Sequence, residues 1–197
     1  MEFLQKCGLI YPSLIYSYKE FVKYIKEYYN AELTPEQILG YIYAILHCPN
    51  YRDKYNEFLK SDYPRIPFVV DLTTFIKLSN LGNELIKAHL LNIEFIESIK
   101  HNYPKFDIIG EGNFEIIKID FIDNKVWINK DQYLEKIAES VWNFKIGSYY
   151  PIQKYLKDRK GEKLHLENLN LIEQQITAIT FTIEKMKYMD SLTIDIF

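Results

Sequence analysis

Three ionisable residues in the middle of the chain, Asp107, Glu115 and Lys118, are of the types that a metal-dependent nuclease uses. Such an enzyme needs two carboxylates and a lysine that converge on one metal ion. On a regular strand successive side chains alternate between two faces, so Glu115 and Lys118, three positions apart, would point to opposite sides. We therefore rank metal-dependent nuclease or hydrolase activity last among the functions considered.

The same stretch contains Gly110-Glu111-Gly112 after an apolar pair, which is a weak form of a nucleotide-binding glycine loop. A functional loop would lead into a helix, whereas the residues that follow have a strand pattern, so we expect a turn before a hairpin. The four histidines, at positions 47, 89, 101 and 165, show no metal-ligand spacing. The sequence also lacks a P-loop, a GxSxG motif and the Asp/Asn-Pro-Pro-aromatic motif of amino-methyltransferases. We expect no catalytic, metal or cofactor site in this chain.

The segment GSYYPIQKYLKDRKG (147–161) concentrates positive charge. Six basic and two acidic residues lie between Asn143 and Leu164, although the whole chain has a net charge of −3. Basic side chains interleaved with tyrosines suit phosphate contact combined with packing on bases or sugars. A solvated helix end, with lysines that complement the helix C-terminus, is the alternative. The residues alone leave both interpretations open.

The composition is that of a globular protein, with 48% hydrophobic and 26% charged residues in 197 positions. Cys7 and Cys48 form no CxxC motif, which favours reduced thiols in a cytoplasmic protein. No apolar run approaches the roughly 18–20 residues that cross a bilayer. We expect cytoplasmic localisation and no membrane partner.

Hydrophobic spacing predicts an α+β fold, with a mainly helical scaffold, a small antiparallel β region and a long C-terminal helix. Thr34, Pro35 and Gln37 signal the start of a helix over 34–47, which is apolar nearly all round and so expected to be buried. β-Branched residues around Asp123-Asn124 predict a hairpin within 113–129. Other helices are predicted over 17–29, after Pro49, over 71–92 with Asp71 as cap, over 149–158 and over 166–189.

Three helices carry apolar stripes at helical spacing. The helix after Pro49 should place Tyr51, Tyr55, Phe58 and Leu59 on one face. The stripe of the 71–92 helix is Phe75, Leu78, Leu81, Leu85 and Ala88. The long helix has a coiled-coil-like seam of Leu166, Leu169, Ile172, Ile176, Ile179, Ile183 and Met186, which could pack on this chain or on another protein.

Two long segments resemble the C-terminal specificity region of type ISP restriction–modification enzymes. The first is ILGYIYAILHCPNYRDKYNEFLKSDYPRIPF (38–68), and the second begins VWNFKIGSYYPIQKYLKDRKG and covers 141–186. The resemblance implies a target recognition domain over 33–190, after a lead-in and first helix over 1–32. Its expected parts are a helical scaffold (34–100), a β-rich part (104–130), a basic loop–helix (143–163) and the long helix (166–189).

The resemblance implies recognition of double-stranded DNA without catalysis. The domain would read base edges in the major groove and place one adenine for flipping into a neighbouring adenine-N6 methyltransferase. That methyltransferase, which uses S-adenosylmethionine, and the motor and nuclease domains would be partners supplied by the rest of the enzyme. The residues expected to contact DNA are Lys145, Ser148, Tyr149, Lys154, Lys157, Arg159 and Lys160, with Arg52 and Arg65 as a second basic set.

Some of these residues have structural interpretations as well. Arg65, between two prolines, could instead anchor a loop by pairing with a helix carboxylate. Gly147 is expected to set the entry into the short helix and Gly161 to stop it. The main alternative function is a protein-interaction module that docks through the 166–189 helix, which requires that its seam be exposed in the isolated chain.

Overall fold

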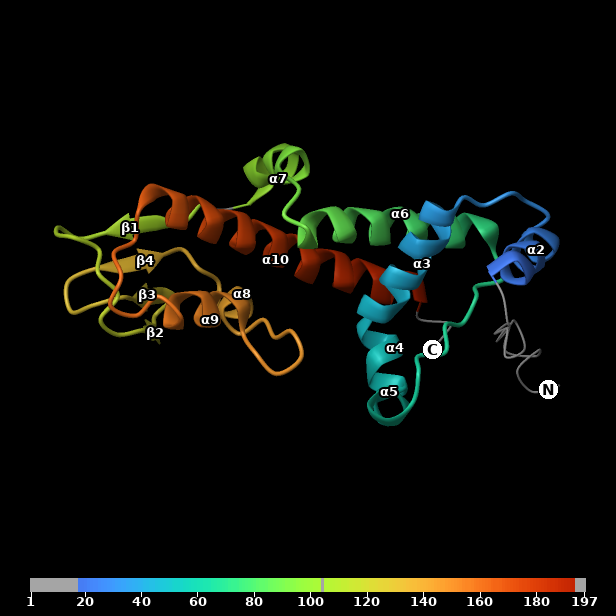
Figure 1. Ribbon diagram of the computed structural model, residues 1–197, viewed down its shortest axis with the longest axis horizontal. Coiled ribbons are helices and arrows are strands. Elements are labelled where there is room, and N and C mark those ends of the chain that lie inside the picture. The colour runs from blue at the N-terminus through green and yellow to red at the C-terminus, as the bar shows by residue number, and fades with distance from the viewer. Residues whose placement is uncertain (1–17, 104, 194–197) are drawn as a thin grey trace. The chain divides into compact units, whose positions relative to one another are not determined.

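The structure, a computed structural model, describes residues 18–103 and 105–193 (Figure 1). The start of the predicted lead-in, with Cys7, lies outside the described residues. The chain divides into two compact units: unit 1 is Met1–Leu90 with Ile183–Phe197, and unit 2 is Leu91–Thr182. Helices predominate and four short strands form one antiparallel sheet, which confirms the predicted α+β class.

Unit 1 is helical. Its elements are α2 (Tyr18–Tyr29), α3 (Pro35–His47), α4 (Pro49–Lys54), α5 (Asn56–Ser61), α6 (Leu72–His89) and the end of α10 (Leu166–Thr193). Local caps set two of the helix starts as predicted. The Thr34 hydroxyl accepts a bond from the Gln37 N–H at 3.2 Å while the Gln37 side chain accepts from the Thr34 N–H at 2.8 Å, which completes a capping box. The Asp71 carboxylate accepts from the Thr74 N–H at 2.7 Å.

Helices α3 and α6 approach each other most closely at two glycines. A Cβ atom on Gly82 would lie 2.6 Å from the carbonyl carbon of Gly40, so only glycine fits there. The Ser79 hydroxyl donates to the Gln37 carbonyl at 2.7 Å across the same contact. Beside it, the Tyr41 ring stacks on Phe75 with centroids 4.3 Å apart. The whole predicted stripe of α6 is buried.

Two predictions for unit 1 are wrong in detail. The Leu39 side chain is 54% exposed, because α3 buries only the side on which Ile38, Tyr41 and Ile45 lie. The helix after Pro49 is interrupted at Tyr55, whose φ of −107° and ψ of 16° leave the helical region. Phe58 therefore belongs to a separate helix, α5, and is exposed instead of joining the buried Tyr51.

Unit 2 combines a sheet with short helices. Its elements are α7 (Ile93–Ile99), η1 (Lys100–Asn102), β1 (Asp107–Ile109), β2 (Asp120–Ile122), β3 (Lys125–Trp127), β4 (Tyr133–Glu135), α8 (Glu139–Trp142), α9 (Pro151–Lys157) and α10 up to Thr182. The strand order is β1-β4-β3-β2, and every neighbouring pair is antiparallel. The predicted hairpin is confirmed as β2–β3. Asp123 and Asn124 have φ values of 52° and 58°, as a type I′ turn requires.

The sheet extends beyond the predicted hairpin. Strand β4 pairs with both β3 and β1, with Leu134 opposite Val126 and Ile108, and it lies past the predicted β-rich part that ends at 130. The loop Gly110-Glu111-Gly112 is a turn after β1, as expected, and its glycines have φ values of 110° and 129°. A Cβ on Gly112 would come within 3.3 Å of the Gln132 side-chain nitrogen, so the loop backbone lies against that buried side chain.

The long helix α10 is buried along the middle of its predicted seam. Ile172, Ile176 and Ile179 are all buried, whereas Leu166 is exposed at the helix start. In unit 2 Phe181 packs edge-on against Phe95 of α7, with centroids 5.4 Å apart. Leu169, Ile183 and Met186 are half-buried, so docking of another protein through this helix stays a prediction. Within the described stretches 18–103 and 105–193, no helix has the length and apolarity to span a membrane.

Candidate nucleic-acid interface

The basic loop–helix is a defined piece of structure in unit 2. It begins with a tight turn in which the Ile146 N–H donates to the Tyr149 carbonyl at 2.9 Å and the Tyr149 N–H donates back at 3.2 Å. Gly147, with φ of 58°, and Ser148 form the tip of that turn, and Tyr149 and Tyr150 are exposed beyond it. Helix α9 follows, with Pro151 as its first residue. The predicted residues Lys145, Ser148, Tyr149, Lys154, Lys157 and Lys160 are all exposed.

Helix α9 is held in place by the burial of its apolar side chains. Ile152, Tyr155 and Leu156 are buried, so the side of the helix that carries Lys154 and Lys157 is left to solvent. Burial of one large aliphatic side chain stabilises a fold by about 1.5–3 kcal/mol. This packing is enough to fix the orientation of a seven-residue helix that would not be stable alone.

Arg159 differs from the neighbouring lysines because it is part of the local structure. Its guanidinium lies 3.7 Å from the centroid of the Tyr155 ring, and its Nη1 donates to the Tyr155 carbonyl at 3.2 Å. That carbonyl is in the last turn of α9, where backbone acceptors lack helical partners. The side chain is only partly exposed. Arg159 therefore caps and braces the end of α9, so it is less available to a ligand than a solvated lysine.

The lysines are held only weakly. Lys154 pairs with Asp158 at 2.8 Å, but both side chains are more than half exposed, and such surface pairs contribute little to stability. Lys157 reaches the Gln153 side chain at 3.5 Å, and Lys145 lies 5.9 Å from the Tyr150 ring centroid. Lys160 has no ion pair among the residues that the structure describes. All four ammonium groups can turn towards an anionic partner at small cost.

Two sets of contacts fix this segment to the sheet. The Gly161 N–H donates to the Ile116 carbonyl at 2.8 Å, and the Ile116 N–H donates to the Glu162 carbonyl at 2.9 Å. On the other side, the Gln153 side chain donates to the Trp142 carbonyl at 3.1 Å, and Trp142 stacks on Phe121 of β2 at 5.3 Å. The expected role of Gly161 as the helix stop is wrong. The helix ends at Lys157, and Gly161, with φ of 89°, begins the pairing with 114–116.

The second predicted basic set is in unit 1. Arg52 is exposed on α4. Arg65 pairs with Asp62 at 3.6 Å, and its carbonyl accepts a bond from the Tyr51 hydroxyl at 2.9 Å. The pairing with a carboxylate at the end of α5 matches the loop-anchoring interpretation of Arg65. Their assignment to DNA contact stays a prediction.

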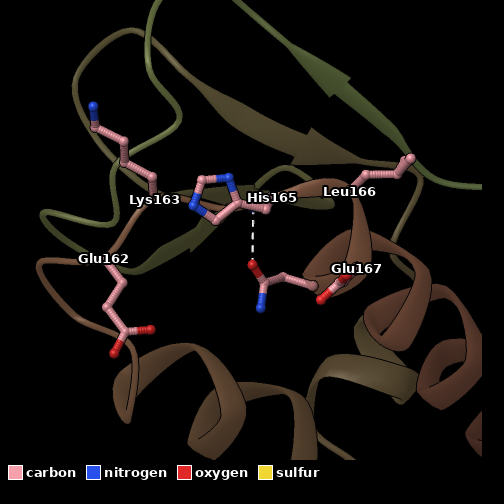
Figure 2. Close-up of a pocket in the computed structure, with 6 residues that line it drawn as sticks. Glu162, Lys163, His165, Leu166 and Glu167 are labelled. Atoms are coloured by element: carbon pink, nitrogen blue, oxygen red, sulfur yellow. Dashed lines mark hydrogen bonds between the residues drawn. The ribbon is translucent and has the colours of Figure 1, made fainter.

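The start of α10 borders an open pocket beside the basic segment, lined by Glu162, Lys163, His165, Leu166, Glu167 and Asn168 (Figure 2). The dashed line in Figure 2 marks the His165 N–H, which donates to the Asn168 side-chain oxygen at 2.8 Å. The carboxylates of Glu162 and Glu167 offset the positive charge of Lys163 in this pocket, and Glu167 already lies in the positive first turn of the helix. The pocket is therefore a mixed-charge surface with no preference for an anion.

The residues considered for metal-dependent cleavage do not converge. Asp107 forms an ion pair with Lys136 that raises the pKa of that lysine, and Lys118 pairs with Asp120 at 2.8 Å. The strand geometry assumed for Glu115 and Lys118 is wrong, because the chain bends at Ile117. Across residues 18–103 and 105–193, no group of three or more His, Cys, Asp or Glu side chains is placed to hold a metal ion.

The sequence patterns missed one residue at this surface. Ile117 lies within the predicted hairpin segment 113–129 but outside its strands, and its side chain is 58% exposed. The N–H groups of Ile117 and Lys118 both donate to the Ile128 carbonyl, at 2.7 and 3.0 Å, and this shared acceptor produces the bend. The imperfect alternation of apolar residues in 113–122 is the signal that could have indicated it.

Three solved structures resemble this chain in fold. The DrdV–DNA complex matches with a TM-score of 0.66 and 20% identity, over 87% of this chain and 19% of that chain. The ATP-dependent Type ISP restriction-modification enzyme LlaBIII bound to DNA gives 0.59 and 19%, over 86% and 12%. A nuclease-deletion mutant of the Type ISP enzyme LlaGI, in complex with a DNA substrate mimic, gives 0.55 and 18%, over 81% and 14%. This chain thus spans less than a fifth of each.

Sequence comparison gives a short match and a long one. The alanine–tRNA ligase of Mycoplasma mobile is 30% identical over 122 residues, which are 52% of this chain and only 13% of the ligase. The model of the Type ISP C-terminal specificity domain family, in contrast, matches residues 18–190, which include both units. Because that match covers nearly the whole described structure, the chain belongs to the Type ISP C-terminal specificity domain family.

Proposed function

We propose that this chain is the DNA sequence-recognition part of a restriction–modification enzyme and that it acts without catalysing a reaction itself. It would bind duplex DNA through the basic loop–helix and position it for an adenine-N6 methyltransferase and a nuclease carried elsewhere. Family membership supports this proposal, and the three similar structures are, by their descriptions, bound to DNA or a DNA mimic. S-adenosylmethionine would be held by the methyltransferase part.

The observation that carries the proposal is the exposure of Lys145, Lys154, Lys157 and Lys160 on one braced segment of a chain with net charge −3. Positive charge is therefore local, as expected for a surface that meets phosphates. Buried residues and backbone pairing with 114–116 fix the segment, so little conformational entropy would be lost on binding. Exposed Tyr149 and Tyr150 add aromatic surface beside the lysines.

The test is a charge reversal of Lys154, Lys157 and Lys160 to Glu in the full 197-residue chain. Binding of the unaltered chain to duplex DNA, measured by fluorescence anisotropy across a salt series, should weaken steeply as salt rises. Each phosphate contact contributes about 0.9 to the slope of log K against log salt, so loss of three contacts should lower the slope by roughly three.

The matched control replaces three exposed lysines of unit 1 by Glu, namely Lys23, Lys77 and Lys87. It changes the net charge by the same amount as the first triple variant. The proposal predicts a much smaller effect for this control. Equal losses in the two triple variants would show that binding follows net charge alone, and the basic loop–helix would then not be the contact surface. Circular dichroism of each variant establishes that its fold is retained.

A further inference from the structure

We infer that Ile117 is a base-reading residue that contacts the 5-methyl group of a thymine in the major groove. This inference rests on the proposed function and assigns specificity to a residue outside the basic loop–helix. In this arrangement the lysines hold phosphates, which carry no sequence information, and Ile117 contributes to the choice of sequence.

The first support is the way in which Ile117 is held. Its N–H donates to the Ile128 carbonyl at 2.7 Å, and Ile128 is fully buried. The preceding residue, Ile116, is also fully buried and is paired with Gly161 and Glu162. The backbone of Ile117 is thus fixed on both sides, and a β-branched side chain has few rotamers. An exposed apolar side chain is common in proteins, but one fixed so firmly is suited to contact a partner.

The second support is the position of Ile117 beside the lysines. The Gly161 N–H donates to the Ile116 carbonyl. Lys160 precedes the donor residue in the chain and Ile117 follows the acceptor residue, so the two are neighbours across this hydrogen bond. Both side chains are exposed. A duplex whose phosphates meet Lys160 would therefore bring a groove close to Ile117.

The third support is the chemistry of the groove. Of the groups that base pairs present in the major groove, the thymine methyl is the apolar one. Next to Ile117, Lys118 has the carboxylate of Asp120 2.8 Å away, so the adjacent pair carries no net positive charge, unlike the lysine cluster of the basic loop–helix. The immediate surroundings of Ile117 thus favour an apolar contact over a further phosphate contact.

The experiment begins with selection of preferred duplexes from a random pool by the unaltered chain. Each thymine of a selected duplex is then replaced by deoxyuridine, which removes only the 5-methyl group. For one position we expect affinity to fall about fourfold, which corresponds to the roughly 0.8 kcal/mol of one buried carbon group. The same replacement should have no effect on the Ile117→Ala variant, whereas Ile117→Val should keep most of the sensitivity.

Ile93→Ala is the matched control, since it removes the same side chain from an exposed site at the start of α7 in unit 2. It should retain the full sensitivity to deoxyuridine. The inference is overturned if no thymine methyl affects binding, or if Ile117→Ala responds to deoxyuridine as the unaltered chain does. In either case DNA binding that depends on Lys154, Lys157 and Lys160 persists, which separates this failure from that of the proposed function, in which duplexes are not bound or the two triple variants lose equal affinity.

Discussion

Replacement of Gly82 by alanine sets two opposing effects against each other at the α3–α6 contact. In an isolated helix, alanine is favoured over glycine by about 1 kcal/mol. In this structure the added Cβ would lie 1.7 Å from the Gly40 carbonyl oxygen, 2.6 Å from its carbon and 3.0 Å from the Ala44 nitrogen. A Cβ atom essentially never lies within 3.0 Å of such an oxygen, so the two helices would have to move apart by more than about 1 Å.

The magnitude follows from the contacts that this separation would weaken. Ser79 donates to the Gln37 carbonyl at 2.7 Å and Asn83 to the Glu36 carbonyl at 3.1 Å across the same crossing. Each hydrogen bond contributes about 1 kcal/mol, and overpacking of a core adds about 1–3 kcal/mol. After subtraction of about 1 kcal/mol for helix propensity, Gly82→Ala should lower the free energy of unfolding by about 3 kcal/mol.

Urea denaturation followed by far-UV circular dichroism measures this change. The control is Asn80→Ala, which alters an exposed position of the same helix, two residues away, where helix propensity dominates. It should be neutral or slightly stabilising. A Gly82→Ala variant that is more stable than the unaltered chain by the propensity difference would refute the backbone contact between α3 and α6.

Three further predictions concern single side chains. Burial, with a smaller contribution from the charge of His47, lowers the pKa of His89 from 6.5 to about 4. As the pH drops from about 6.5 to 4, His89 is protonated in the unfolded chain but not in the folded one, so the free energy of unfolding should fall over this range. A His89→Gln variant should show a shallower pH dependence of its urea midpoint, and an unchanged one would contradict the assignment. Tyr41→Phe should lower the free energy of unfolding, measured by urea denaturation, by about 2 kcal/mol. The Tyr41 hydroxyl donates to the Pro67 carbonyl at 2.6 Å and accepts from the Val69 N–H at 3.1 Å, both in the core. A loss below about 0.5 kcal/mol would refute this. Asn124→Gly should be tolerated in the type I′ turn whereas Asn124→Ala should cost about 1 kcal/mol, and equal thermal midpoints for the two would argue against the positive φ at this residue.

The elements that were predicted correctly have signals within a few residues of one another. The capping box of Thr34 and Gln37 and the Asp71 cap fix two helix starts through bonds across three positions. The turn at Asp123-Asn124 likewise depends on two residues that tolerate positive φ. These elements can be predicted from the sequence because their hydrogen bonds and backbone angles require no distant partner.

The elements that were missed depend on distant partners. Strand β4 has three residues, too few for a period to be visible, and its pairing with β1 joins Glu135 to the distant Asp107. The bend at Ile117 depends on the Ile128 carbonyl, eleven positions away, which accepts two bonds. The imperfect alternation of apolar residues in 113–122 indicates an irregular strand, but local pattern and propensity do not identify the distant acceptor that places the bend.

In the candidate site, too, the sequence shows the type of each cationic residue, whereas its role depends on the contacts that it makes in the fold. Charge counting treats Arg159 and Lys157 alike, but only the planar guanidinium can stack on Tyr155 while donating to that residue's carbonyl. The two residues consequently do different work: Arg159 holds the end of α9, and Lys157 remains available to solvent. A recognition surface needs both, because phosphate contacts fix the register of a base-reading residue only if the element that carries them is itself fixed. In this chain the pairing of Gly161 with Ile116 provides that link, since it joins the lysine segment directly to the backbone beside Ile117.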